Sequence, residues 1–222
     1  MKFSIGKQMI LTFLLAVGLV SSSYAGFLEK RTRIELKGGL WHQQNDITAT
    51  VTGGVVESNY SGEGGMGGLI VSHWIKEDIA LLISVSGLGV SIDNRVGPGS
   101  VYDHTVVVAP ILFGARYYFP KSTFGTSWRP YVTGAVGPVI GNDRIEEVTS
   151  TEVTVTERNE SAIGGHVGAG VDVALSRLFM LGFSGGYYFQ SDFDQPVGGK
   201  ESYNGPEFGI SFSILLGKGA GN

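Results

Sequence analysis

The last long stretch of the chain, residues 205–217, alternates between apolar side chains and small or polar ones. Phe208, Ile210, Phe212, Ile214 and Leu216 occupy every second position, and glutamate, glycine and serine lie between them. Because successive side chains of a strand point to opposite faces, this stretch predicts a strand with one apolar and one polar face. A strand of about ten residues with this split suits a tilted crossing of a bilayer.

A strand in hydrocarbon needs partners on both sides, because an open sheet edge would leave backbone groups without hydrogen bonds. The chain must therefore supply enough strands to close a barrel. Seven further segments have strand character: 33–41, 64–74, 79–92, 104–119, 129–141, 162–175 and 178–190. Together with the last stretch they make an even set, as outer-membrane barrels have.

The spacers between these segments alternate in length. Longer ones at 43–63, 93–103, 142–161 and 191–204 alternate with shorter ones at 75–78, 120–128 and 176–177. Outer-membrane barrels have short periplasmic turns and longer outside loops, whereas a soluble barrel has no reason to sort its loops by end. We therefore predict an all-β fold, an eight-stranded antiparallel up-and-down transmembrane β-barrel over residues 26–222. Its first and last strands should pair with each other. The valines in 142–161 predict that this loop rises beyond the membrane as a β-ribbon.

The start of the chain predicts an export signal. Lys2 and Lys7 precede an apolar run over residues 9–20, and Ser23 and Ala25 supply the small residues that a signal peptidase requires. We expect residues 1–25 to be cleaved. The chain has no cysteine, so neither disulfides nor a lipid-anchored cysteine is expected. Without residues 1–25, 14 basic residues face 20 acidic ones, which argues against nucleic acid as a partner.

Polar residues on the inward faces predict a network inside the barrel. An eight-stranded barrel is just wide enough for side chains to fill its interior, and inward glycines would make room for long polar neighbours. The expected members are Glu35, Lys37, Arg116, His166 and Asp172. His166 and Asp172 share one strand face but stand about 20 Å apart at strand rise, too far to form a catalytic pair.

Aromatic residues collect near the expected strand ends, where they predict two girdles at the membrane interfaces. One set falls near the short turns: Trp74, Tyr117, Tyr118, Phe119, Trp128, Tyr131 and Phe179. The other falls near the long loops: Trp41, Tyr187, Tyr188, Phe189 and Tyr203.

Two prolines lie inside adjacent expected strands, Pro110 in 104–119 and Pro138 in 129–141. Proline removes a donor from the ladder, and a turn centred near Gly125 would place the two opposite each other within about one residue. Val108 and its neighbours also give the fourth segment an apolar inward face. We hypothesise a weak lateral seam through which small hydrophobic molecules pass between the barrel interior and the membrane.

Other motifs predict no reaction. Residues 62–67 spell G-x-G-x-x-G, but a strand follows where a dinucleotide site requires a helix. The four histidines have no zinc-type spacing. Asp192, Asp194 and Glu201 could gather a calcium ion, but a D-x-D pair alone is a weak signal. We therefore predict no catalytic, cofactor or metal site.

The mature chain resembles the small eight-stranded outer-membrane barrels of the OmpA, OmpX and OmpW type. The most specific piece is the closing strand, because Glu207, Gly209, Phe212 and Ile214 fit in register the terminal signal of clients of the barrel-assembly machinery. Residues 218–222 extend past the strand, whereas the family usually ends in an aromatic residue. The resemblance implies insertion by that machinery into the outer membrane, in contact with its lipid and with both termini in the periplasm. It implies no reaction.

Three functions follow from this reading, in order of preference. The first is a non-enzymatic, porin-like barrel with a structural or surface-exposed role and limited passage of small solutes. The alternative is transport of small hydrophobic compounds or lipids through the seam near Pro110 and Pro138. The second alternative is a lipid-modifying barrel enzyme, which would need a Ser or Asp beside a His near the outer leaflet.

Overall fold

The structure of the protein is a computed structural model that describes residues 30–42, 63–97, 100–119, 128–149, 153–176 and 178–217. The expected signal peptide and the loop at 43–62 lie outside the described residues. In the part of the chain that is described, no helix is long and apolar enough to cross a membrane.

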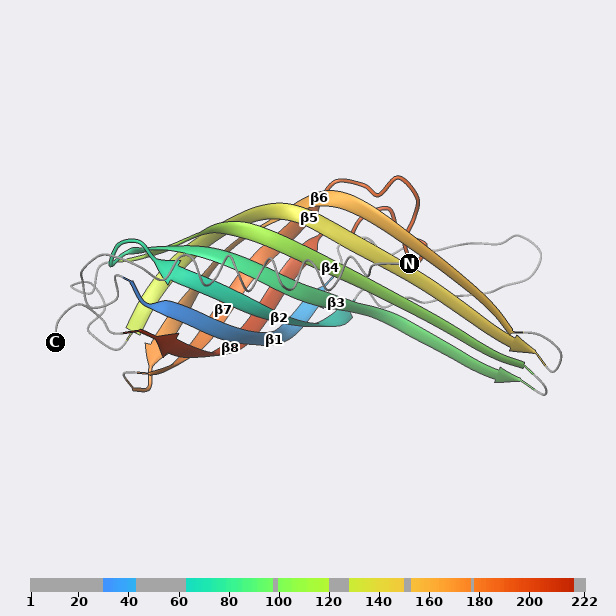
Figure 1. Ribbon diagram of the computed structural model, residues 1–222, viewed down its shortest axis with the longest axis horizontal. Helices are drawn as coiled ribbons and strands as arrows, with labels where there is room; N and C mark the ends of the chain where they lie inside the picture. Colours follow the sequence, from blue (N-terminus) through green and yellow to red (C-terminus); the bar gives the residue numbers. More distant parts are fainter. Residues whose placement is uncertain are drawn as a thin grey trace, which may run out of the picture.

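The described chain forms a closed antiparallel barrel in which each strand pairs with its sequence neighbours (Figure 1). The predicted fold class is confirmed, and each predicted segment coincides with the barrel part of one strand. The strands are β1 Thr32–His42, β2 Glu63–Trp74, β3 Ile79–Gly97, β4 Ser100–Tyr118, β5 Trp128–Thr149, β6 Val153–Ala174, β7 Phe179–Gln190 and β8 Gly205–Leu216.

The first and last strands close the barrel, as expected. β1 pairs antiparallel with β8 from Thr32 opposite Leu216 to Trp41 opposite Glu207. The start of β1 and the end of β8 therefore lie at the same end as the short connections at 75–78 and 175–178. We call this the turn end, and we call the opposite end the mouth.

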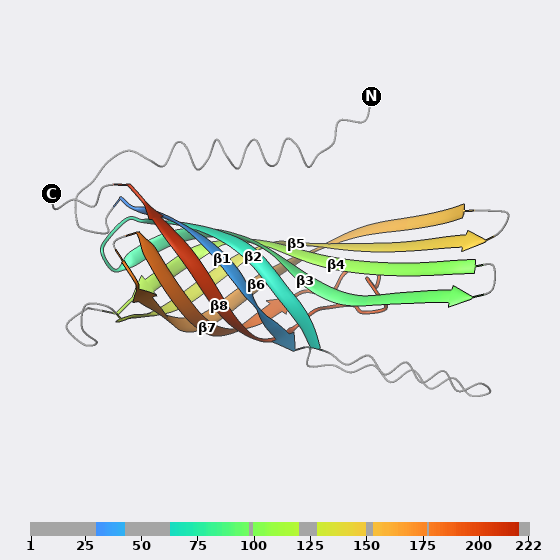
Figure 2. The same cartoon turned by 90° about the horizontal axis from the view of Figure 1, so that it is seen from below.

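Four strands continue well beyond the barrel at the mouth, as Figures 1 and 2 show. The β2–β3 pairing stops at Met66 opposite Leu88, but the β3–β4 pairing runs on to Gly97 opposite Ser100. The β5–β6 pairing likewise reaches Val148 opposite Val153, which confirms the predicted ribbon. The prediction of a loop over 93–103 is wrong, because β3 and β4 extend alongside that ribbon and complete a four-stranded sheet. We call this sheet the extension.

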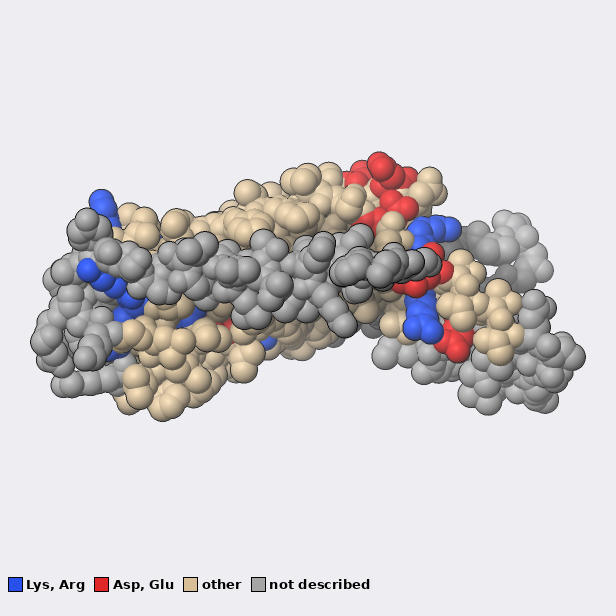
Figure 3. Space-filling view, in the orientation of Figure 1, with Lys and Arg blue, Asp and Glu red and all other residues tan. Residues whose placement is uncertain are grey.

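The outer wall of the barrel is apolar. Every charged side chain described in the strands of the barrel section is turned inward and buried or nearly so. The exposed wall carries instead large apolar residues from seven of the strands, all but β2, among them Leu36, Leu81, Phe113, Val136, Ile163, Phe183 and Phe208. In Figure 3 uncharged side chains prevail between two ends where charged ones gather. The predicted lipid-type face of the closing strand is confirmed by its strict alternation of buried and exposed residues.

The two predicted aromatic girdles are only partly correct. Tyr117, Phe119, Trp128 and Phe179 are exposed at the turn end, as expected. Other members point into the barrel and are at most 8% exposed: Trp74, Tyr118 and Tyr131 near the turn end, and Trp41, Tyr188 and Tyr203 near the mouth. The physical reason is parity, because neighbours such as Tyr117 and Tyr118 must face opposite sides of the sheet.

Candidate functional site

A buried ionic cluster fills the barrel interior near the turn end. Arg33 of β1 is hydrogen-bonded to Glu35 on its own strand and to Asp172 of β6. Arg116 of β4 reaches Glu35 Oε2 at 3.1 Å and Asp172 Oδ2 at 3.6 Å. Tyr118 donates to Asp172 Oδ2 at 2.8 Å. These side chains are 0–3% exposed, so two cations and two anions compensate one another away from solvent. We call this set the lower cluster.

Aromatic rings surround the guanidinium groups of this region. Arg116 lies over the ring of Tyr131 at 4.1 Å from its centroid, and Arg129 lies over Tyr118 at 4.7 Å. Trp74 stacks on Tyr118, with ring centroids 5.6 Å apart. Such contacts stabilise cations that have lost part of their hydration. The turn end of the barrel is therefore closed by stacked rings and arginines.

A second ionic cluster lies nearer the mouth. Lys37 Nζ of β1 is 2.5 Å from Glu207 Oε1 of β8, and His166 Nε2 of β6 is 2.9 Å from the same oxygen. The His166 ring lies 4.7 Å from the ring of Tyr188, whose hydroxyl is 3.3 Å from Ser86 Oγ. Glu207 is fully buried. We call this set the upper cluster.

The predicted interior residues therefore divide between two clusters rather than forming one. Glu35, Arg116 and Asp172 belong to the lower cluster, and Lys37 and His166 belong to the upper one. The predicted network did not include Arg33 and Tyr118. Arg33 lies two residues before Glu35, and Tyr118 lies two residues after Arg116, so side-chain alternation places each on the same inward face as that neighbour. Glu207 was predicted only as part of an assembly signal.

Inward glycines make room for these polar side chains. A Cβ added to Gly182 would lie 2.7 Å from Asp172 Oδ1, and one added to Gly209 would lie 2.5 Å from Lys37 Cε. A Cβ on Gly186 would lie 2.4 Å from His166 Nε2. The glycines thus allow charged groups to occupy an interior that is otherwise packed with side chains.

A small cavity of about 40 Å³ separates the two clusters. Its lining includes Glu35 and Arg116 on one side, Lys37 and His166 on the other, and Ser84 between them. The cavity is large enough for a water molecule, and apolar side chains such as Met66 and Leu82 line much of it beside these polar groups. The described interior therefore provides no continuous wide channel.

The mouth is covered by the connection between β7 and β8, residues 191–204, which we call the cap. Its apolar side chains turn into the barrel, where Phe193 is 4%, Val197 0% and Tyr203 1% exposed. They pack in one buried cluster with wall residues from seven strands, β1–β7, among them Trp41, Met66, Leu88, Val106, Val108, Leu112, Val139, Ala162 and Tyr188. The interior next to the mouth is therefore apolar and filled in part by the chain's own loop.

The two prolines lie close together, beside this apolar region. Pro110 is buried and pairs with Val139, the neighbour of Pro138, whereas Pro138 is exposed on the outer wall. The β4–β5 pairing breaks off after Pro110 opposite Val139 and resumes at Phe113 opposite Val136. The ladder is therefore interrupted beside both prolines.

The residues of the proposed assembly signal occupy both faces of β8. Glu207 and Gly209 face the interior, whereas Phe212 and Ile214 are exposed on the outer wall at 44% and 41%. In the described part of the chain, no three His, Cys, Asp or Glu residues are grouped as metal ligands would be. The side chain of His104 lies outside the described residues.

Comparison with known proteins identifies the fold. No protein-family model and no curated protein matches the sequence. Among solved structures, Ail, the attachment invasion locus protein of Yersinia pestis in complex with the heparin analogue sucrose octasulfate, has a TM-score of 0.53 at 10% identity. The match covers 87% of this chain and 100% of that one. Neisserial surface protein A gives 0.49 at 11% identity, covering 84% and 97% of the two chains. OprG from Pseudomonas aeruginosa, an outer membrane protein, gives 0.42 at 13%, covering 88% and 98%. The chain therefore has the fold of the small eight-stranded outer-membrane barrels.

Proposed function

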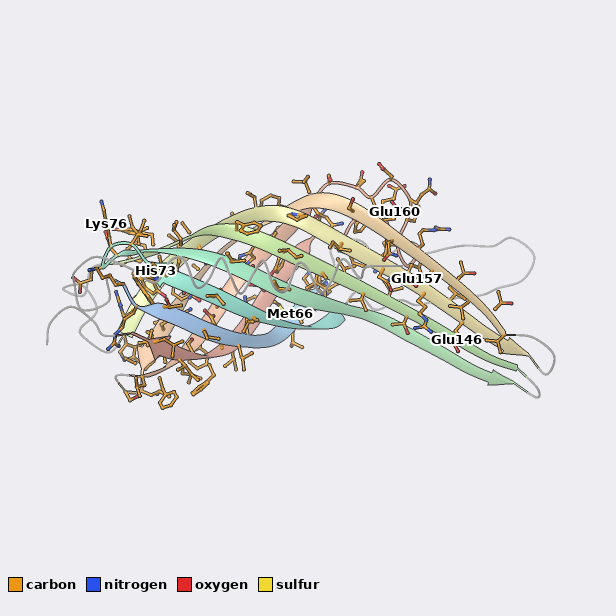
Figure 4. All side chains as sticks on the ribbon, viewed as in Figure 1. Met66, His73, Lys76, Glu146, Glu157 and Glu160 are labelled. Carbon is orange, nitrogen blue, oxygen red and sulfur yellow. The ribbon has the colours of Figure 1, made fainter. Side chains whose placement is uncertain are left out.

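We propose that the protein is a non-enzymatic outer-membrane barrel that displays a β-sheet at the cell surface. One observation carries the proposal: an uncharged apolar wall ends where β3–β6 continue as a sheet, and the described side chains of β5 and β6 there are mostly polar and mostly exposed. A wall of this kind suits hydrocarbon, and the extension suits water. Figure 4 shows the contrast, with Lys76 at the turn end and Glu146, Glu157 and Glu160 along the extension. The turn end is then periplasmic and the mouth faces outward.

The extension offers an unpaired strand edge for binding. β7 accompanies β6 only as far as Gly164 opposite Gln190, so residues 153–162 of β6 have β5 on one side only. Exposed Val153 and Val155 alternate there with threonines, a composition that favours strand addition. An extended peptide of a partner could pair with this edge through backbone hydrogen bonds. The surface-exposed role of this protein would then be protein binding.

The charge of the extension limits the kind of partner. Residues 142–161 contain six acidic and two basic residues. Ail was solved with a sulfated heparin analogue. The acidic ribbon of this chain would repel such a polyanion at low salt, because both carry negative charge and their approach is electrostatically unfavourable. A neutral or basic protein partner is the better fit.

Single cysteines test the location and the orientation, since the natural chain has none. Thr154→Cys lies in the extension, and Lys76→Cys lies at the turn end, both at exposed positions. A membrane-impermeant maleimide should label Thr154→Cys on intact cells and Lys76→Cys only after the outer membrane is permeabilised. Labelling of Lys76→Cys alone on intact cells would show the reverse orientation. Recovery of both variants in the soluble fraction would contradict the membrane location.

A second function, passage of small apolar compounds, has its own support. The apolar upper interior adjoins the interrupted β4–β5 ladder at Pro110 and Pro138. Replacing both prolines by valine returns two ladder donors and should close a lateral path. Uptake of an uncharged apolar fluorophore into proteoliposomes should then fall several-fold, whereas Pro130→Val, in β5 but near the turn end, should leave uptake unchanged. Equal uptake by all three proteins would rule out the seam.

A further inference from the structure

The cap is a folded element with its own turn. Val197 and Lys200 form a two-residue hairpin, with N–O distances of 2.9 and 3.1 Å. Gly198 and Gly199 occupy the turn with φ of 57° and 76°, the left-handed region that glycine adopts without strain. Tyr203 donates its hydroxyl to Val197 O at 2.6 Å and so joins the base of the cap to its tip. The cap is therefore internally connected from its base to its tip.

The ends of the cap are fixed to the barrel by polar groups. Ser191 N donates to Ile163 O at 2.8 Å, and Gln190 N donates to Asn204 Oδ1 at 2.6 Å. At the tip, Gly198 N donates to Asp143 Oδ2 at 3.0 Å. Between these points Phe193 and Val197 make apolar contacts with the wall. Rotation of the cap about its two ends would expose the wall beneath without breaking any strand pair of the barrel.

The wall is shaped to receive the apolar side chains of the cap. A Cβ added to Gly141 of β5 would lie 2.8 Å from Val197 Cγ2 and 3.0 Å from Phe193 Cζ. Val106 of β4 touches the cap from the other side, 2.8 Å from a Cβ placed on Gly198. Glycine at 141 thus leaves a hollow that Phe193 and Val197 fill. Lifting the cap would leave this hollow facing water, at an energetic cost proportional to the apolar area exposed.

We infer that this hollow is a binding site for a small uncharged apolar molecule, which the chain's own Phe193 and Val197 occupy while the cap is closed. An apolar ligand that binds only the open form repays the cost of opening, because it covers the same surface, and it shifts the population toward that form. This site would supply the ligand for the second proposed function, passage of apolar compounds through the β4–β5 seam. Pro110 and the interrupted ladder lie next to the hollow, so only the later exit of the ligand through the seam rests on that function.

Thiol labelling tests the site without any transport step. Val197→Cys, in a chain with no other cysteine, is placed in lipid nanodiscs and exposed to a water-soluble maleimide with and without naphthalene. Labelling is scored on the folded band of a heat-modifiable gel. Labelling of Val197→Cys should be slow without naphthalene, and naphthalene should accelerate it at least several-fold. Phe193→Ala in the same background should accelerate it without ligand. Charged 1-naphthalenesulfonate should have no effect, and Thr154→Cys should be labelled at one rate throughout.

A cysteine pair gives an independent measurement. Gly141→Cys with Val197→Cys places two thiols face to face, because a Cβ on Gly141 would lie 2.8 and 3.1 Å from the two methyl carbons of Val197. Naphthalene should slow oxidation of this pair, because the open cap separates the thiols. If Val197→Cys does not fold, Phe193→Cys serves as the reporter.

The inference fails if naphthalene changes neither labelling nor oxidation, or if the sulfonate acts as strongly as naphthalene. It also fails if Val197→Cys is labelled at the rate of Thr154→Cys without ligand, because the cap is then not closed. The Pro110 and Pro138 variants should keep the naphthalene effect. A loss of passage in those variants therefore tests the seam separately from the cap.

Discussion

Asp172 holds together the charges of the lower cluster. Its carboxylate accepts from Arg33 and Tyr118 and lies 3.6 Å from Arg116. Removing it would leave buried cations without their full set of partners, whereas the loss of an exposed loop charge is nearly neutral.

Asp172→Ala is therefore expected to lower the free energy of unfolding by about 3–5 kcal/mol, the usual cost of breaking a buried pair. Urea titration of the protein in lipid vesicles measures the change. Asp192→Ala, at an exposed position in the cap, is the matched control and should shift the free energy by less than about 0.5 kcal/mol. Equal effects of the two variants would refute the structural role of Asp172.

Glycines inside and outside the barrel should respond differently to a methyl group. Gly182→Ala places a Cβ 2.4 Å from Ser211 Oγ and 2.7 Å from Asp172 Oδ1, so neighbours must move. We expect a loss of about 1–3 kcal/mol in unfolding free energy. Gly38→Ala meets no atom within 4 Å and should be neutral or slightly stabilising, because alanine loses less backbone entropy on folding. A larger loss for Gly38→Ala in the same titration would contradict the assigned faces.

At the scale of the element, β8 and the extension should differ in their tolerance of charge. Ile210 is 57% exposed on the outer wall, in the strand that closes the barrel. Ile210→Arg is expected to cost up to about 2–4 kcal/mol in vesicles, as for arginine facing lipid. Thr154→Arg, exposed on the extension, should cost almost nothing. If Ile210→Arg is as stable and inserts as fully as the natural chain, the wall does not face lipid.

The barrel should fold without the β5–β6 ribbon of the extension. Its ribbon pairs Asn142 with Asn159 and continues to Val148 opposite Val153, beyond the last residues that contact the barrel wall. Replacing residues 144–157 by Asn-Gly, which suits a two-residue hairpin, should leave the heat-modifiable gel shift intact. The same deletion should abolish binding of any partner that pairs with the β6 edge. Loss of the gel shift would mean that the β5–β6 ribbon is needed to form the barrel.

At the scale of the whole molecule, the barrel is filled from end to end. Stacked rings, the lower cluster, the upper cluster and the cap succeed one another along its axis, and the cavity between the clusters is only about 40 Å³. In planar bilayers we therefore expect no sustained conductance above the lipid background.

Lys37→Ala combined with Glu207→Ala removes the ion pair of the upper cluster and leaves the lower one in place. Conductance should still be absent, because the turn end remains closed. The heat-denatured protein in the same bilayer serves as the blank. Steady currents through the natural chain would contradict a filled interior and would favour passage of small solutes along the barrel axis.

The alternation of residue types determined most of the fold. Side-chain parity in 205–217 and in seven other segments gave the strands and their inward and outward faces. The strands and their faces are local features, because each residue's face follows from its neighbours in the chain. Closure of β1 on β8 followed instead from the rule that an open sheet edge cannot lie in hydrocarbon. The same alternation turns Tyr117 outward and Tyr118 inward, so the prediction that both belong to one aromatic girdle was wrong for Tyr118.

The tertiary structure alone decided which inward residues meet. Arg33 and Asp172 are 139 residues apart, and Glu207 rather than Asp172 is the partner of His166. Such pairs depend on the register of all the strands around a closed barrel, which no single segment specifies. The cap likewise depends on the match between Val197 and the hollow at Gly141. The sequence by itself therefore determined a barrel and the direction in which each side chain points, whereas closure of the barrel decided how its interior and its mouth are filled.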